Sequence, residues 1–235
     1  MFERRSALDG HVLQDFALHN GTGVRAQTVL PSAVSRADRS AADRSAADRS
    51  AADRSAADDA APAVTLSLRH PHALLQISAF AQSIDEAGAR LSEVAALKLP
   101  APNRYSGDAQ KSLRATGAGI WQLAGDPATI AHASSLRAKI AGVGTVVDLS
   151  HARAVLQLSG RAAAKTLAKH CGLDLYSAAF PTGAATNTRF GHLGMTLARI
   201  DDAPTFELMV FRGYAAFVFE SLAASAAEFG LRIRF

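Results

Sequence analysis

The segment Thr145–Leu175 constrains the fold of this chain more than any other part of its sequence. Val146 and Val147 begin a β-branched run, which is typical of a strand. The polar residues Asp148 and Ser150 favour a turn, and a second apolar run over 155–158 predicts another strand. The first half of the segment therefore predicts two successive strands separated by a short turn.

The second half of this segment predicts a helix that follows a glycine corner. Gly160 ends the second strand, and the preceding Ser159 has a side chain able to cap the helix. Apolar residues then recur at helical spacing at Ala164, Leu167, Ala168 and Cys171. Two strands that lead into one helix form a fold element, and the segment contains no self-sufficient catalytic motif.

Length and composition predict a protein with a true hydrophobic core. The 235 residues allow one sizeable domain or two small ones, and 49% of them are hydrophobic. Cys171 is the only cysteine, so no intramolecular disulfide can form, as is usual in a reducing compartment. No apolar run has the length of a secretory signal or a membrane span. We therefore expect a cytoplasmic protein that does not contact a membrane.

The charge pattern argues against nucleic-acid binding. The formal net charge is +4, and the lysines and arginines are scattered along the chain. A nucleic-acid surface needs a basic stripe or an aromatic stacking platform, and aromatic residues make up only 6% of the sequence. We expect no nucleic-acid partner.

A five-residue repeat interrupts the N-terminal part of the chain. Arg39-Ser-Ala-Ala-Asp43 recurs three more times, ending at Asp58. A period of five keeps no residue type on one helix face and is too short for a solenoid unit. We expect residues 36–61 to be a disordered low-complexity insert, and residues 1–35 to be partly ordered with a strand near 24–30.

After the repeat, the apolar pattern predicts two α+β halves, residues 62–143 and 144–235. Further strands are predicted over 64–69, 74–80, 120–123, 186–190, 195–200, 205–210 and 231–235. Helices are predicted over 84–97, 126–141 and 214–229, and a loop over 103–119. Strand pairs punctuated by single helices indicate an α+β fold with antiparallel sheets and helices on one face.

The helix predicted over 214–229 has the clearest apolar pattern. Its apolar or small residues recur at the spacing of one helix face, at Tyr214, Phe217, Val218, Ser221, Leu222, Ser225 and Phe229. Gly230 ends it. We expect this face to cover a sheet.

No polar motif predicts a catalytic residue or a metal site. Gly142-Val143-Gly144 precedes a strand, whereas a dinucleotide loop needs the order strand, glycines, helix. His70 and His72 supply two imidazoles, and His170-Cys171 adds no third ligand with zinc-site spacing. Cys171 lies on the apolar side of its predicted helix, which favours packing over catalysis.

A series of short motifs occurs in the same order as in a known family. They are the segment 145–175, Ala179-Phe180-Pro181-Thr182-Gly183, Thr188-Arg189-Phe190-Gly191-His192, Thr205-Phe206-Glu207-Leu208, the last helix and Leu99-Pro100-Ala101-Pro102-Asn103. Together they resemble the gamma subunit of heterotetrameric sarcosine oxidase, from Val64 to the C-terminus and most closely over 145–229. Two features depart from the family. Gly119–Asp126 lacks one tryptophan and the Gly-Pro turn of the family's Trp-Leu-Gly-Pro-Asp-Glu-Trp segment, and the five-residue repeat is foreign to it. The chain is therefore identified as a divergent member.

That family in turn resembles the folate-binding aminomethyltransferase (T-protein) fold, with ββαβ and βαββ units. In the T-protein fold, an aspartate that contacts folate follows a strand–glycine–helix unit, and Asp174 stands at the matching place here. The T-protein hairpin is replaced by Gly191–Gly194. The resemblance leaves two readings of Asp174, a helix-end or turn residue and a folate ligand.

The resemblance implies an accessory subunit of a sarcosine oxidase-type complex. Such complexes demethylate sarcosine to glycine with formation of hydrogen peroxide, and pass the one-carbon unit to tetrahydrofolate. FAD, FMN and NAD belong to the larger subunits, so this chain is expected to bind none and to pack on the alpha subunit of an alpha, beta, gamma and delta assembly. Two alternatives stay open: a free-standing folate-binding aminomethyltransferase-like protein, and a paralogue that has lost its partner.

Overall fold

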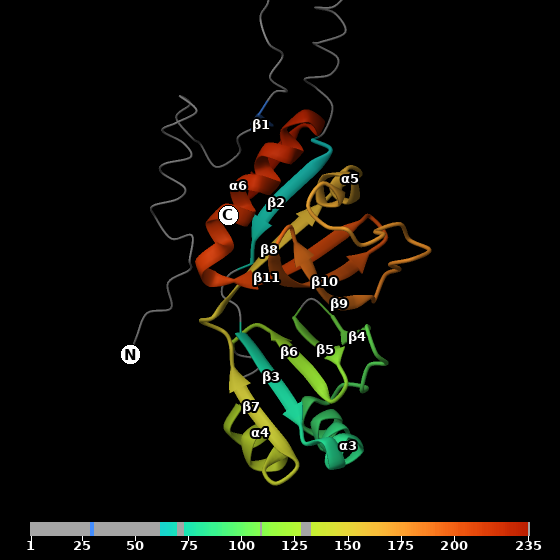
Figure 1. Ribbon diagram of the computed structural model, residues 1–235, viewed down its shortest axis with the longest axis vertical. Coiled ribbons are helices and arrows are strands. Elements are labelled where there is room, and N and C mark those ends of the chain that lie inside the picture. Colours follow the sequence, from blue (N-terminus) through green and yellow to red (C-terminus); the bar gives the residue numbers. More distant parts are fainter. Residues whose placement is uncertain (1–28, 31–61, 70–72, 109, 128–132, 235) are drawn as a thin grey trace, which may run out of the picture.

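The computed structural model describes residues 29–30, 62–69, 73–108, 110–127 and 133–234 (Figure 1). The predicted repeat insert 36–61 lies outside the described residues, and so do His70 and His72. Of the predicted N-terminal segment, only β1 (Val29–Leu30) is described.

Seven of the described strands form the upper sheet of Figure 1. Their order across the sheet is β1, β12 (Leu231–Arg234), β2 (Val64–Leu68), β8 (Arg153–Ser159), β11 (Thr205–Phe211), β10 (Leu193–Asp201) and β9 (Ala185–Phe190). Neighbouring strands are antiparallel except for β12 and β2, which are parallel.

The lower sheet has five described strands and is antiparallel throughout. Their order is β4 (Tyr105–Gly107), β5 (Lys111–Gly117), β6 (Ile120–Gly125), β3 (Ala73–Ala79) and β7 (Gly144–Asp148). The predicted antiparallel sheets are therefore confirmed.

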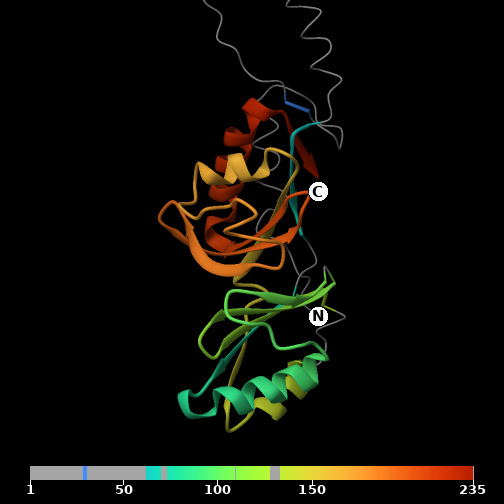
Figure 2. The same ribbon diagram turned by 90° about the vertical axis from the view of Figure 1, so that its right-hand side faces the viewer.

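Helices cover the outer face of each sheet, so that the two sheets face each other (Figure 2). The five-stranded sheet carries α3 (Ile84–Ala95) and α4 (Ala133–Ile140), and the seven-stranded sheet carries α5 (Ala163–Ala168) and α6 (Ala215–Ala226). Short 3₁₀ turns are η2 (Ala81–Ser83), η3 (Arg212–Tyr214) and η4 (Ala227–Phe229). The predicted α+β class with helices on one face of each sheet is confirmed.

Among the described residues, no helix combines the length and the apolar character that crossing a membrane requires.

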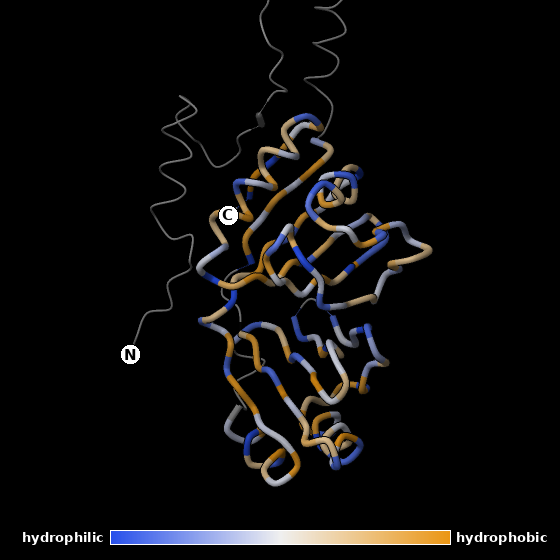
Figure 3. Tube along the Cα trace, viewed as in Figure 1, coloured by the Kyte–Doolittle hydropathy of each residue, from blue (hydrophilic) through white to orange (hydrophobic). Residues whose placement is uncertain are grey.

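The alternation of side chains along the strands separates two kinds of environment. In β11, Phe206, Leu208 and Val210 pack in the main core beneath α5 and α6, whereas Glu207 and Met209 face the other sheet. Apolar residues mark the core-forming strands in Figure 3. The chain thus buries a separate core under each pair of helices and leaves a mixed layer between the sheets.

This inter-sheet layer contains few apolar side chains. Leu74, Ala124, Val155 and Met209 form its small apolar cluster, with Leu149 packed against them. Its other members include buried polar and charged side chains at Arg114, Gln122, Thr196 and Glu207. A buried polar side chain needs a partner inside the protein, so this layer concentrates the polar groups from which a functional site can be built.

The predicted loop over 103–119 is wrong, because this segment forms β4 and β5. Leu113 and Ala115 face the core beneath α3, whereas Arg114 points between the sheets. Residues 112–116 alternate between polar and apolar side chains, as a strand does, but the run is short and contains only two apolar residues, so its pattern is weak.

The predicted cap at Ser159 is also wrong. Ser159 stays in the sheet, opposite both Thr65 and Thr205, and α5 begins only at Ala163 after an N-cap at Ala162 that has no side-chain hydrogen bond. Gly160 makes the corner with a φ of +109°, a conformation that residues with a β-carbon rarely adopt.

The predicted inner face of the last helix is partly wrong. Val218 and Leu222 are buried, but Tyr214 and Phe217 are exposed. Ala215, Phe219, Ala223 and Ala226 complete the buried face. The buried face of α6 is therefore rotated towards its alanines.

The division into halves at residue 143 stays a prediction, and the strand pairing exchanges two strands across it. β2 pairs with β8 and β12 in the seven-stranded sheet, although it precedes residue 143. β7 follows that residue and pairs with β3 in the five-stranded sheet. The chain therefore passes between the sheets after β2 and again at 149–152.

Candidate functional site

A cavity of about 210 Å³ lies between the two sheets. Its walls are Arg69, Tyr105, Gly107, Asp108, Ser112, Arg114, Gln157, Ile200 and Glu207. Both sheets contribute, because β4 and β5 supply one wall and β8, β10, β11 and the residue after β2 supply the other. The site exists only when the sheets are stacked.

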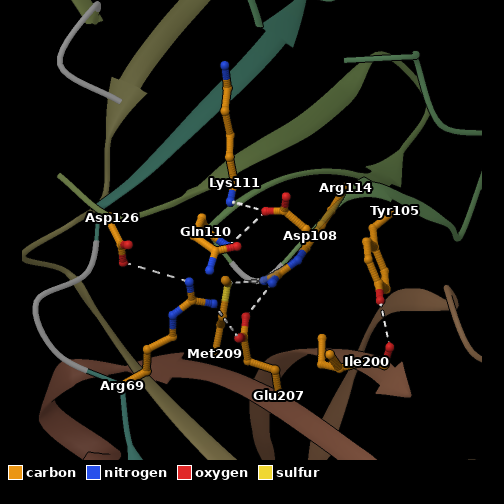
Figure 4. Close-up of polar contacts among 10 residues, drawn as sticks. All are labelled: Arg69, Tyr105, Asp108, Gln110, Lys111, Arg114, Asp126, Ile200, Glu207 and Met209. Atoms are coloured by element: carbon orange, nitrogen blue, oxygen red, sulfur yellow. Dashed lines mark hydrogen bonds and ion pairs between the residues drawn. The ribbon is translucent and has the colours of Figure 1, made fainter. Parts of the chain in front are cut away.

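Glu207 is the central charged group of this site (Figure 4). Its side chain is 0% exposed, and its two carboxylate oxygens bind different arginines. Oε1 accepts a hydrogen bond from Nη2 of Arg114, which is 1% exposed, and Oε2 accepts one from Nη1 of Arg69 at 3.0 Å. One carboxylate on the seven-stranded sheet therefore binds a guanidinium from the opposite sheet and another from its own.

The two arginines keep this carboxylate ionised. Burial alone would raise the pKa of Glu207, but the positive charges of Arg114 and then Arg69, with their hydrogen bonds, lower it from 4.5 to about 2. A carboxyl group with such a pKa stays ionised near neutral pH. General acid–base catalysis requires a group that gains and loses a proton near the working pH. Glu207 is thus suited to holding the sheets together.

Arg114 satisfies its buried guanidinium only in part. Besides Glu207, its Nη1 donates to Sδ of Met209 at 2.9 Å, a thioether that is a weak acceptor. Its Nε has no hydrogen-bond partner among the described residues. The Arg114–Glu207 pair is therefore a buried charge pair whose only other charged partner in the described chain is Arg69. Removing either residue leaves the other with a poorly compensated buried charge.

Two further polar residues of the cavity, Tyr105 and Asp108, make local hydrogen bonds. The Tyr105 hydroxyl donates to the carbonyl oxygen of Ile200 at 3.0 Å and so ties β4 to β10. Burial raises the pKa of Tyr105; Arg114 opposes this effect, and the negative charges of Glu207 and Asp201 add to it. Oδ1 of Asp108 accepts hydrogen bonds from the backbone N–H groups of Gln110 and Lys111, each at 2.9 Å.

A weaker ion pair extends the site towards the surface. Nη2 of Arg69 lies 3.8 Å from Oδ1 of Asp126, whose side chain is half exposed. The arrangement therefore runs from a fully buried carboxylate through Arg69 to the solvent. In chemical terms it is a charge-balanced connection between sheets rather than an activated nucleophile or base.

Asp174, the site residue suggested by resemblance, is not among the residues that line this cavity. It lies exposed on the segment between α5 and β9, and its Oδ1 accepts a hydrogen bond from the backbone N–H of Tyr176 at 3.0 Å. This is the geometry of an Asx turn. A role for Asp174 in binding folate stays a prediction.

His170 and Cys171 occupy packing positions at the end of α5. The His170 ring stacks on Phe190 with centroids 4.4 Å apart, and its Nε2 is 2.7 Å from Oγ of Ser225. Burial lowers the pKa of His170; a hydrogen bond to the Ser221 backbone opposes this effect and Lys169 adds to it. Cys171 is buried, with Sγ 3.7 Å from Oγ1 of Thr188.

Sequence reasoning missed the residues of the inter-sheet site. Glu207 appeared only as part of a family motif, and Arg114 fell in a segment predicted as a loop. A usable signal is present: in Thr205–Phe211 a single carboxylate interrupts an otherwise apolar run. Such a residue in a central strand calls for a buried partner, although the sequence does not say which one.

The fold defines the class of protein. An aminomethyltransferase T of the glycine cleavage system from Bartonella henselae shares it with a TM-score of 0.55 and 18% identity, over 74% of this chain and 48% of that one. A chain of the heterotetrameric sarcosine oxidase from Corynebacterium sp. U-96, solved in complex with pyrrole 2-carboxylate, matches with a TM-score of 0.65 and 28% identity. That match covers 78% of this chain and 94% of the other. Both likenesses place the chain among proteins with the aminomethyltransferase-like fold.

The family itself follows from the sequence model of the sarcosine oxidase gamma subunit family, which matches residues 78–228. The match runs from the end of β3 into η4, just after α6. This chain belongs to the sarcosine oxidase gamma subunit family, as the resemblance predicted. A comparison with curated protein sequences finds no match.

Proposed function

We propose that this chain is the accessory gamma subunit of a sarcosine oxidase-type complex and packs on the alpha subunit. The observation that carries the proposal is the family match over 78–228, together with the 94% coverage of a chain from a heterotetrameric sarcosine oxidase. Agreement over nearly the whole of that chain supports a common role as a subunit rather than a shared module. The assembly would contain alpha, beta and delta subunits besides this one.

The reaction proposed for the complex is the oxidative demethylation of sarcosine to glycine in the cytoplasm, with transfer of the one-carbon unit to tetrahydrofolate. FAD, FMN and NAD would be held by the larger subunits. In this chain, the cavity of about 210 Å³ is smaller than the roughly 300–1,000 Å³ typical of sites for drug-sized ligands. This small volume supports the proposal that the larger subunits hold these cofactors.

A structural role for this chain is supported by the state of its buried charges. Glu207 binds two guanidinium groups, and Arg114 spans the sheets to reach it. These groups stabilise the stacked sheets and hold the surface that a partner would contact. The proposal assigns no catalytic residue to the chain.

Co-purification tests the proposal directly. The full chain, carrying an affinity tag, would be co-expressed with candidate alpha, beta and delta subunits, and the eluate analysed by mass and by flavin absorbance. We expect a flavin-containing assembly with this chain in fixed stoichiometry. A colourless monomer that leaves the alpha subunit in the flow-through would overturn the proposal.

A further inference from the structure

Three large aromatic side chains are exposed where β11 leads into α6. Phe211 is 46% exposed, Tyr214 49% and Phe217 57%. They recur every third residue through η3 into the first turn of α6, a spacing that places helical neighbours side by side. We call these three residues the aromatic ridge.

Through Phe217, the aromatic ridge gives the first turn of α6 a second, exposed apolar side. The first face, with Val218, Phe219 and Leu222, already covers the seven-stranded sheet. A helix that is apolar on more than one face is usually buried on more than one side. The exposed side of the first turn is therefore suited to contact with another surface.

Two arginines accompany the ridge, Arg153 beside it and Arg212 within it. The guanidinium carbon of Arg153 lies 3.5 Å from the centre of the Phe211 ring, and the two residues are directly opposite each other in β8 and β11. The backbone N–H of Arg212, inside the ridge, donates to the carbonyl oxygen of Ala152 at 2.9 Å. Within the part of the chain that the structure describes, neither guanidinium forms an ion pair, in contrast to surface cations such as Lys169 and Lys139.

The ridge also lies at the junction of the two sheets. Ala152 belongs to the segment 149–152 through which the chain passes from β7 to β8 (Figure 1). In the same segment, the backbone N–H of Leu149 donates to the Leu74 carbonyl of the five-stranded sheet at 2.8 Å. A partner seated on the ridge would therefore hold the point where the sheets are joined.

We propose that the aromatic ridge, with Arg153 and Arg212, is the surface that docks on the alpha subunit, against an apolar patch that carries carboxylates. Aromatic residues and arginine are the side chains most enriched in the energetic centres of protein interfaces. Carboxylates are the complementary groups for two guanidiniums that lack ion-pair partners in the described chain. This inference rests on the proposed function.

Charge selects this partner over a second copy of the chain. In a two-fold symmetric dimer the ridge would face itself, so Arg153 and Arg212 of one copy would meet the same arginines of the other. Like charges brought together at an interface oppose association. A nucleic acid is a poorer fit as well, because two arginines supply few of the phosphate contacts on which its binding depends.

Matched pairs of variants test the ridge in the co-expressed complex. Phe217→Ala removes a ridge aromatic, and Tyr176→Ala removes an aromatic that is 81% exposed on the segment between α5 and β9. Arg212→Glu reverses a ridge charge, and Arg189→Glu reverses an exposed charge on β9. We expect both ridge variants to weaken the affinity for the rest of the complex at least tenfold, and both control variants to change it less than threefold.

The measurements are titration of the full chain into the complex lacking it, circular dichroism of each variant, and light scattering of the chain alone. Failure of the wild-type chain to bind at all overturns the proposed function. Wild-type binding with unchanged affinity in folded Phe217→Ala and Arg212→Glu overturns the ridge alone. If these variants lose self-association but still assemble with the complex, the ridge contacts a second copy of the chain. That outcome also overturns the proposal.

Discussion

Arg114 of β5 and Glu207 of β11 form a buried ion pair that joins the two sheets (Figure 4). The residues are 93 positions apart in the chain, and neither side chain is more than 1% exposed. Arg69 completes the group by binding the second carboxylate oxygen of Glu207. Each residue neutralises the buried charge of the other, and the stacking of the sheets depends on this pair.

Removing the carboxylate should destabilise the fold severely. Glu207→Gln leaves two guanidiniums without their buried counter-ion, so we expect the free energy of unfolding in urea to fall by about 3–5 kcal/mol. Glu86→Gln is the matched control, because Glu86 pairs with Arg90 on the exposed surface of α3 at 2.5 Å. Glu86→Gln should lower the free energy of unfolding by less than about 0.5 kcal/mol. Equal losses in the two variants would show that the inter-sheet pair contributes no more than a surface pair.

Stability should fall in acid through Glu207. Its folded-state pKa of about 2 lies below the ordinary value of 4.5, so its contribution is fully present above about pH 4.5 and disappears as the pH falls towards 2. The difference corresponds to about 3 kcal/mol. Urea unfolding at pH values between 2 and 6 measures it, and Glu207→Gln should flatten that part of the profile. An unchanged acid profile in the variant would assign the acid sensitivity to other carboxyl groups.

The glycine corner after β8 should reject a β-carbon. Gly160 has a φ of +109°, and an added Cβ would lie 2.4 Å from the carbonyl oxygen of Ala63. We expect Gly160→Ala to lower the free energy of unfolding by at least about 2 kcal/mol. Gly142→Ala has a positive φ but free space and should cost about 1 kcal/mol, and Gly172→Ala should cost less still. Thermal melts that show the same midpoint for Gly160→Ala and Gly172→Ala would contradict the strain argument.

Asp174 decides between the accessory subunit and the folate-binding alternative. Its exposed carboxylate serves an Asx turn, so Asp174→Ala should cost less than about 1 kcal/mol in unfolding and leave complex formation unchanged. Calorimetric titration of the full chain with tetrahydrofolate should show no binding before or after the change. Binding by the wild-type chain that disappears in Asp174→Ala would favour the folate-binding alternative.

Local periodicity was sufficient to predict most of the strands. Val64–Leu68, Ala185–Phe190 and Thr205–Phe211 form strands close to their predicted bounds, because each is a short run of strand-forming residues bounded by turn residues. The order of the family motifs was sufficient for the family, since the match over 78–228 confirms it. These features depend on residues that are near one another in the sequence.

The segment Thr145–Leu175 shows that local sequence patterns predict strands but not their pairing. Its two strands were predicted, but they belong to different sheets: β7 pairs with β3, and β8 pairs with β2 and β11. The β-branched pattern of Val146 and Val147 is the same whichever sheet receives the strand. Pairing depends on register and on the neighbours that the rest of the chain provides.

Local patterns in the sequence establish the α+β class, most of the strand-forming segments and the family. The three-dimensional fold determines which strands share a sheet, brings Arg114 to Glu207, and turns Phe217 outwards while Ala223 faces the core. The physical reason is that a charge in a strand is favourable or costly only through its partner in space. That partner lies on another sheet, at a distance along the chain that no local pattern records.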